Sequence, residues 1–205
     1  MISYQTTAPT FEPVTLEELK SQARISHTRE DALLTRLVRV ARTSVEAFLK
    51  YGLCSQVTRV EWNDSPDSEV AYLKIPATQV TDVKAYYLDS DSDQQTFDDD
   101  GTYLRWTLGA GGAPSRVILK PNANWPTTQG NGGAFWADVT HGFASPNAVP
   151  QDIRDAILKA ATYWFNNRSG HRKSDSPARM TSVQQELQLP PEVQTMLASY
   201  QMIWL

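Results

Sequence analysis

The sequence predicts an α+β protein in which a helical body carries a large antiparallel β insertion. Helical periodicity is found near both ends of the chain, in residues 13–52 and 149–168. Between them lie short runs rich in β-branched and aromatic residues, separated by turn residues. No helical crossover fits between these runs, so antiparallel pairing is expected. We therefore assign residues 1–55 and 145–205 to the helical body and residues 56–144 to the β module.

The first helix is expected to begin at a capping box. Thr15 and Glu18 have the spacing at which each side chain can bond the backbone N–H of the other residue. This pattern predicts a short helix that ends at about Arg24. Thr28 is then the expected N-cap of a longer helix, and Gly52 its left-handed C′ residue.

The longer helix has an apolar stripe at i, i+3 and i+4 spacing, which favours one face packed in a core. The stripe consists of Leu34, Leu37, Val38, Ala41, Val45, Phe48 and Leu49. Three arginines, Arg36, Arg39 and Arg42, lie mostly on the other faces of this helix. These arginines are the candidate residues for an interface between subunits.

Six strands are expected in the β module, each identified by its β-branched and aromatic content. They are residues 57–62, 70–75, 80–88, 102–106, 116–119 and 134–140. Hairpins and meanders are the expected connections. Two segments rich in glycine and proline, 109–114 and 122–133, are predicted to be loops.

Helicity resumes after Pro150, with one apolar stripe from Ile153 to Trp164. Pro190 and Pro191 are expected to open a short helix that ends at about Tyr200. The last residues are large and apolar, although chain ends are normally polar and frayed. We expect this tail to be either tucked onto its own core or buried in a partner. It consists of Tyr200, Met202, Ile203, Trp204 and Leu205.

The residues that could carry chemistry are scattered. The 205-residue chain has one cysteine, Cys54, which cannot form an internal disulfide. The histidines, His27, His141 and His171, are far apart and are expected to be surface or loop residues. No metal-ligand spacing, phosphate-binding loop or membrane-spanning apolar run is found. The sequence therefore predicts a protein that is not an enzyme, with no cofactor, no metal and no membrane association.

Three alternating aspartates, Asp89, Asp91 and Asp93, are the one feature that resembles a metal site. Calcium loops open in this way, but Gln94 stands where the loop needs glycine, and Asp100 is shorter than the usual bidentate glutamate. An acidic hairpin tip is the favoured interpretation. The first half of the β module is acidic as a whole, which serves either solubility or electrostatic matching between neighbouring copies.

Several segments together resemble the head–tail connector proteins, also called adaptor or head-completion proteins, of long-tailed bacteriophages and phage-like gene transfer agents. The matching segments are residues 13–20, 30–34, 45–48, 149–158, 164–168 and 189–193, followed by Leu197 and Tyr200. This resemblance implies a helical body with a β insertion. It also implies a ring of neighbouring copies, expected to be a dodecamer, in the virion neck.

The resemblance further implies the partners of such a ring. It would sit beneath the portal protein, extend the DNA channel and present a surface to a tail-side neck or stopper protein. Connector C-terminal segments often dock on the portal, which implies portal contacts for the tail defined above. Members often end with Tyr-Arg, whereas here Gln201 follows Tyr200. The net charge is −4, so DNA is expected to pass through without specific binding.

Two other function classes remain open at this point. The β module is rich in aromatic residues and is a candidate binding surface for a protein or a carbohydrate. These aromatic residues are Trp62, Tyr72, Tyr86, Tyr87, Tyr103 and Trp106. An enzyme would instead need a carboxylate pair with perturbed pKa values in a deep pocket.

Overall fold

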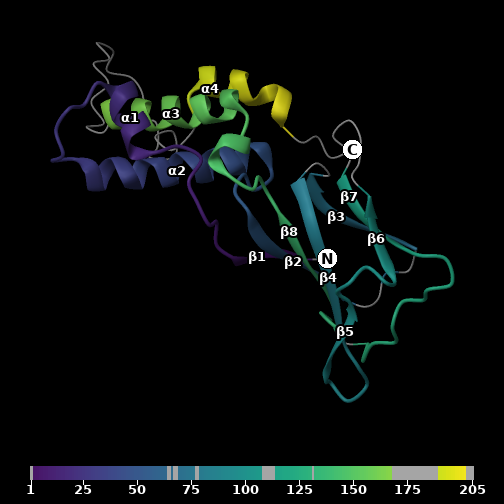
Figure 1. The fold of residues 1–205 in the computed structure, drawn as a ribbon. Coiled ribbons are helices and arrows are strands. Elements are labelled where there is room, and N and C mark those ends of the chain that lie inside the picture. Colours follow the sequence, from purple (N-terminus) through teal and green to yellow (C-terminus); the bar gives the residue numbers. More distant parts are fainter. Residues whose placement is uncertain are drawn as a thin grey trace, which may run out of the picture. The chain divides into compact units, whose positions relative to one another are not determined.

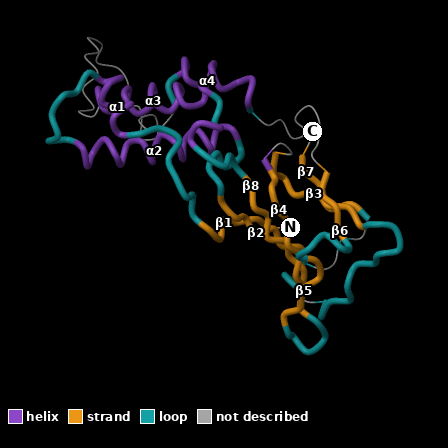
Figure 2. The backbone as a smooth tube through the Cα atoms, viewed as in Figure 1, coloured by secondary structure: helices purple, strands orange, loops and turns teal. Residues whose placement is uncertain are grey.

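The computed structural model describes residues 2–63, 66, 69–76, 79–107, 114–130, 132–167 and 189–201. The described residues contain four α-helices and eight strands, so the predicted α+β class is confirmed. Helices and strands are segregated into two compact units (Figures 1 and 2). The helical unit comprises residues 11–53 and 145–201, and the β unit comprises residues 1–10 and 54–144.

The helical unit is built around α3, which contacts each of the other helices. Its helices are α1 (Leu16–Ala23), α2 (Asp31–Leu49), α3 (Gln151–Asn166) and α4 (Pro191–Leu197). Most of the predicted stripe on α2 is buried, whereas Leu37 and Phe48 are half-buried. The buried apolar side chains of this unit include Val14, Leu19, Leu34, Val38, Ala41, Val45, Leu49, Leu53, Val149, Ile153, Ala156, Ile157, Ala160, Ala161, Trp164, Phe165, Leu189, Val193 and Leu197.

The ends of α1 agree with those predicted from the sequence, whereas the ends of α2 differ from the prediction. The capping box of α1 is formed: the Thr15 N–H donates to Glu18 (2.7 Å), and the Glu18 N–H donates to the Thr15 hydroxyl (3.2 Å). Thr28 is not the N-cap of α2, because its carbonyl accepts the Asp31 N–H and closes a turn before the helix. At the other end, Lys50 takes the left-handed conformation (φ 69°) in place of Gly52.

The β unit contains two antiparallel sheets. The larger has the strand order β1-β2-β8-β4-β5, made of Ile2–Thr7, Gln56–Trp62, Phe135–His141, Val80–Leu88 and Gln94–Asp98. The smaller has the order β3-β7-β6, made of Val70–Pro76, Pro114–Leu119 and Leu104–Thr107. Buried side chains of both sheets form one core: Val60, Leu73, Val80, Val83, Ala85, Leu104, Val117, Leu119, Phe135, Ala137 and Val139.

All six predicted strands are present, but two strands were missed. Residues 2–7, assigned from the sequence to the helical body, form β1 at one edge of the larger sheet. All six of its side chains are exposed, and the alternation of Ile2 and Tyr4 with polar residues is too short to predict a strand. Residues 94–98 form β5 at the other edge, where mostly polar side chains are exposed in the same way. The prediction that hairpins and meanders connect all the strands was also wrong, because β2 pairs with β8, which is distant in the sequence.

The ends of β2 and β8 meet where the chain enters and leaves the β unit. Cys54 and Phe143 form a parallel bridge there, and the Ser55 N–H donates to the Phe143 carbonyl (3.1 Å). Gly142 lies between them with φ 106°, a conformation that favours glycine. A Cβ at Gly142 would lie 2.3 Å from the Cys54 carbonyl oxygen. This close backbone approach therefore requires glycine.

We expect Gly142→Ala to lower the free energy of unfolding by about 2 kcal/mol or more, from the positive φ and the clash together. Gly130→Ala is the matched control, because Gly130 also has a positive φ (72°) but nothing within 4 Å of the added Cβ. That variant should lose only about 1 kcal/mol. Urea denaturation measures the free energy of unfolding of both variants. Equal losses of this free energy would show that the close approach to the Cys54 carbonyl is not what requires glycine at position 142.

Candidate assembly surfaces

The described residues carry little that resembles an active site. Within them, no group of three His, Cys, Asp or Glu side chains is placed to hold a metal ion. In the same part of the chain, no helix is long and apolar enough to cross a bilayer. His27 is exposed, 3.9 Å from Glu30, and His171 lies outside the described residues.

His141 is not the surface or loop histidine that the sequence predicted. It lies on β8 and is 4% exposed, with its Nε2 2.8 Å from the Thr58 hydroxyl. Burial lowers the pKa of the imidazole to about 4. The alternating pattern of β8 could have revealed this, because His141 shares the buried parity of Phe135 and Val139. His141 is thus a neutral part of the packed interior of the sheet.

The buried His141 makes stability depend on pH. An unfolded histidine titrates near 6.5, so between pH 6.5 and about 4 only the unfolded chain binds this proton. The free energy of unfolding therefore falls as the pH drops through this window. Relative to His141→Gln, the wild type should lose on the order of 2 kcal/mol more in urea denaturation across it. The control His27→Gln, at an exposed site, should show the same dependence of the unfolding free energy on pH as the wild type. If His141→Gln showed that same dependence too, the assignment of His141 as a buried neutral residue would be refuted.

Arg42 is an internal residue of the helical unit. Its guanidinium lies 2.8 Å from Glu12 and 2.6 Å from Glu46, and its side chain is 12% exposed. Glu46 also accepts the Leu53 N–H (2.8 Å). Burial raises the pKa of Glu46, although Leu53 and Arg42 act in the opposite direction. Arg42 therefore joins α2 to the segments before and after it.

Arg36 and Arg39 are presented to solvent on the same helix. The Arg39 side chain is 69% exposed, and its Nε lies 4.0 Å from a Glu12 oxygen. Arg36 is exposed as well. Of the three arginines predicted to form a subunit interface, these two are placed to reach another molecule. Their role in an interface stays a prediction.

Substitution separates these two kinds of arginine. Arg42→Ala leaves the partly buried carboxylates of Glu12 and Glu46 without this cation, and we expect it to lower the free energy of unfolding by about 2 kcal/mol. Arg36→Ala, on an exposed face of the same helix, should cost about 0.5 kcal/mol or less. Both values can be read from urea denaturation. Similar losses for the two variants would contradict an internal role specific to Arg42.

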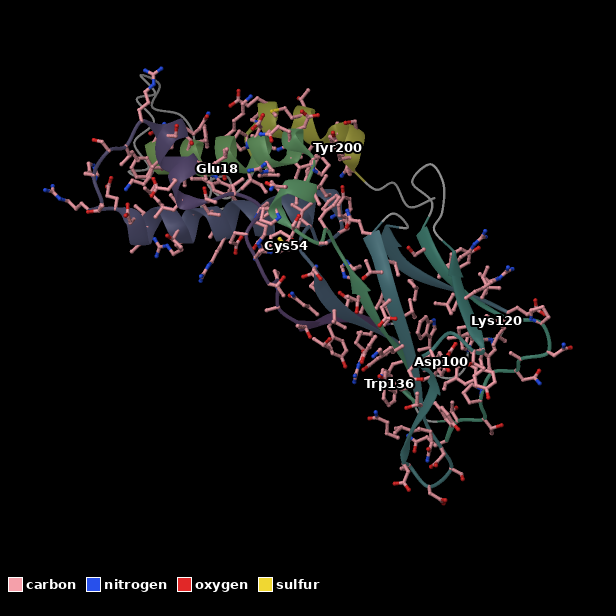
Figure 3. The ribbon with its side chains drawn as sticks, in the orientation of Figure 1. Glu18, Cys54, Asp100, Lys120, Trp136 and Tyr200 are labelled. Carbon is pink, nitrogen blue, oxygen red and sulfur yellow. The ribbon has the colours of Figure 1, made fainter. Side chains whose placement is uncertain are left out.

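The described chain ends at residues held by the helical unit. The Tyr200 hydroxyl donates to the Asp152 carboxylate (3.0 Å), and the Gln201 amide donates to the Phe48 carbonyl (3.2 Å). Figure 3 labels Tyr200 on the last helical turn of the chain. The remaining tail residues, Met202, Ile203, Trp204 and Leu205, lie outside the described residues. Tyr200 thus fixes the point from which the tail departs.

The aspartate run forms the tip of the β4–β5 hairpin, as predicted. One oxygen of Asp89 accepts the N–H groups of Asp91 and Asp93 (both 3.0 Å), and the other accepts the Gln95 amide (2.7 Å). These hydrogen bonds, with that of Gln95 foremost, lower the pKa of Asp89. The Asp89 carboxylate therefore organises the turn through its own chain.

Most of the aromatic residues singled out in the β module pack against other rings or the core. Trp62 and Tyr87 pack against the core, Tyr86 stacks on Trp136, and Tyr103 stacks on Phe97. Tyr72 is 53% exposed on the smaller sheet, and the Trp106 side chain lies outside the described ones. Trp62 and Tyr103 are joined through a cluster formed by the rings of Phe97, Trp125 and Phe135. These rings therefore contribute to packing within the β unit.

A two-unit α+β fold of this kind is found in proteins of the virion neck. Residues 13–98 match the family described as "Phage gp6-like head-tail connector protein". No curated protein matches the chain. The resemblance to head–tail connectors that the sequence motifs indicated is thus confirmed.

Three solved structures share the fold over the whole chain. They come from the neck of an empty gene transfer agent (GTA) particle computed with C6 symmetry, the virion of a native GTA particle, and the neck of a native GTA particle computed with C12 symmetry. Their identities to this chain are 19%, 20% and 19%, and their TM-scores are 0.73, 0.72 and 0.71. Each match covers 100% of this chain and 97% of the other.

Proposed function

We propose that this chain is a structural subunit of a virion neck, at the junction of head and tail. In this proposal its copies form a ring beneath the portal protein, extend the DNA channel and offer a surface to the next neck component. The observation that carries the proposal is the fold, which matches a neck protein along its full length. The family match over residues 13–98 points the same way.

A ring requires each subunit to carry two different surfaces that fit one another in closed rotation. The related neck structures are computed with C6 and C12 symmetry, which supports a ring of twelve copies here. The exposed face of α2 with Arg36 and Arg39 is one candidate for such a surface.

The portal contact is assigned to the C-terminal tail. Large apolar side chains at a chain end are suited to a partner's pocket, and tryptophan and tyrosine are frequent anchors in such contacts. Tyr200 and Gln201 are tied to α3 and α2 by the hydrogen bonds described above, so the tail would depart from a fixed point. A tail held in this way loses less conformational freedom on docking.

The proposed channel lets DNA pass without holding it. Each phosphate that a protein neutralises adds salt-dependent affinity, which would slow DNA movement. A net charge of −4 is consistent with passage. The role is one of assembly, in which a subunit docks, orders its tail and creates the next binding surface.

Light scattering of the purified chain, alone and with its portal protein, tests this function. We expect ring-sized particles or a portal complex from the full chain. A chain ending at Gln201 keeps the contacts of Tyr200 and Gln201 but lacks residues 202–205, so it should fold and lose portal binding. A chain ending at Ser199 should behave in the same way.

One control variant and two contrary outcomes complete this test. Tyr200→Phe removes only the hydroxyl bonded to Asp152, so it should weaken portal binding less than the loss of residues 202–205 does. A chain that stays monomeric and ignores the portal would refute the neck assignment. Retention of duplex DNA by the isolated protein at physiological salt would argue against free passage of DNA.

A further inference from the structure

The larger sheet of the β unit ends at β1 on one side and at β5 on the other (Figure 1). In an antiparallel pair, only part of the backbone N–H and C=O groups of a strand point toward its neighbour. Apart from a bond between the Gln5 amide and the Thr7 carbonyl, the described backbone partners of β1 all belong to β2. Those of β5 all belong to β4. The outer edge of each strand therefore presents backbone groups that have no partner among the described residues.

The outer edge of β1 lacks the usual protection against pairing. Natural proteins protect an exposed edge with lysine, proline or a bulge. The strand Ile2–Thr7 contains no charged residue and no proline, and all six of its side chains are exposed. A register shift lies between Gln5 and Thr7, so the strand pairs regularly with β2 up to that point. Ile2 is 63% exposed and Tyr4 is 44% exposed, and alternation places both on the same side of the strand.

The outer edge of β5 is similar in length and polarity. Gln94, Gln95 and Thr96 are exposed and uncharged. Phe97 packs against the core of the β unit, and the acidic residue of the strand, Asp98, is 3% exposed. The inward side chains therefore anchor β5, whereas its edge is uncharged. The two edge strands have six and five residues, so they could pair along most of their length without placing like charges opposite each other.

We propose that β1 of one copy pairs edge to edge with β5 of a neighbouring copy, so that the larger sheet continues from subunit to subunit. Every copy carries both edges, at opposite sides of the same sheet. A contact between two different edges repeats head to tail and can close into a ring. Pairing of β1 with β1 would instead be two-fold and would stop at a dimer. The ring of the proposed function therefore favours β5 as the partner of β1.

This inference rests on the proposed function and deepens it, because it names a contact that would join the subunits of the ring. In strand addition, main-chain hydrogen bonds provide affinity and alternate side chains provide specificity. Ile2 and Tyr4 would add apolar contact on one side of the joined strands. The contact would also give a backbone partner to groups that the single copy leaves exposed at both edges.

Crosslinking of introduced cysteines tests the contact in the full chain. Ser3→Cys places a thiol on β1 and Thr96→Cys places one on β5, both at exposed positions. Within one copy these strands are four strand spacings apart, roughly 19 Å, which a short bis-maleimide does not span. With this reagent, the double variant S3C/T96C should give a ladder of covalent oligomers on a denaturing gel. An equimolar mixture of the two single variants should give dimers that neither gives alone. The wild type is the control, because its Cys54 is buried.

A second pair of variants blocks the edge directly. S3K/Q5K places two lysines on β1, the protection that natural edge strands often carry. Ring-sized mass should therefore be lost in mass photometry. S21K/S26K adds the same charge at exposed positions of the helical unit and should assemble like the wild type.

The outcomes separate this contact from the neck function. Rings from S3K/Q5K, or a ring-forming mixture of the cysteine variants without mixed dimers, would overturn the contact and leave the neck function standing. Crosslinked dimers from S3C alone would indicate pairing of β1 with β1 and would overturn it as well. A wild type without self-association would also overturn the contact, and portal binding would then judge the neck function separately.

Discussion

The pairing of β2 with β8 is the constraint on which the architecture depends. Residues 54–144 interrupt the helical unit between α2 and α3, which pack against each other. A long segment can be inserted there only if its two ends are brought together. The unbroken antiparallel register from Gln56 with His141 to Trp62 with Phe135 achieves this. Closing a long loop costs entropy only logarithmically in its length, so the larger sheet can absorb the cost.

Polar groups have two roles in these units, one inside the chain and one at its surface. Carboxylates inside the chain organise it: Glu46 ties Arg42 to the Leu53 backbone, and the buried Asp98 accepts three backbone N–H groups, from Thr102, Tyr103 and Leu104. Some exposed charges, in contrast, are grouped by sign, with carboxylates on the hairpin tip and Arg36 and Arg39 on α2. Groups of this kind affect the choice of partner more than they affect stability.

Much of the architecture could be predicted from the sequence, because local chemistry and tertiary structure agree there. Thr15 and Glu18 form their capping box, and the runs with β-branched residues became strands of the core. Other features depend on contacts distant in sequence. Lys50, and not Gly52, has the left-handed conformation after α2. The helix ends there because the Leu53 N–H donates to the Glu46 carboxylate. The residue types of the candidate surfaces could be predicted from the sequence. Which of these residues lie together depends on the strand order, which the sequence does not reveal.

The N-terminal strand has a consequence for biosynthesis. β1 leaves the ribosome well before β2, its only strand neighbour among the described residues. At roughly 5–20 residues per second, about fifty intervening residues mean that β1 stays unpaired for several seconds. Only two of its six side chains, Ile2 and Tyr4, are large and apolar, a composition that does not favour aggregation of the unpaired segment. β1 and β2 can then pair before β8 is made and joins them to β4 and β5.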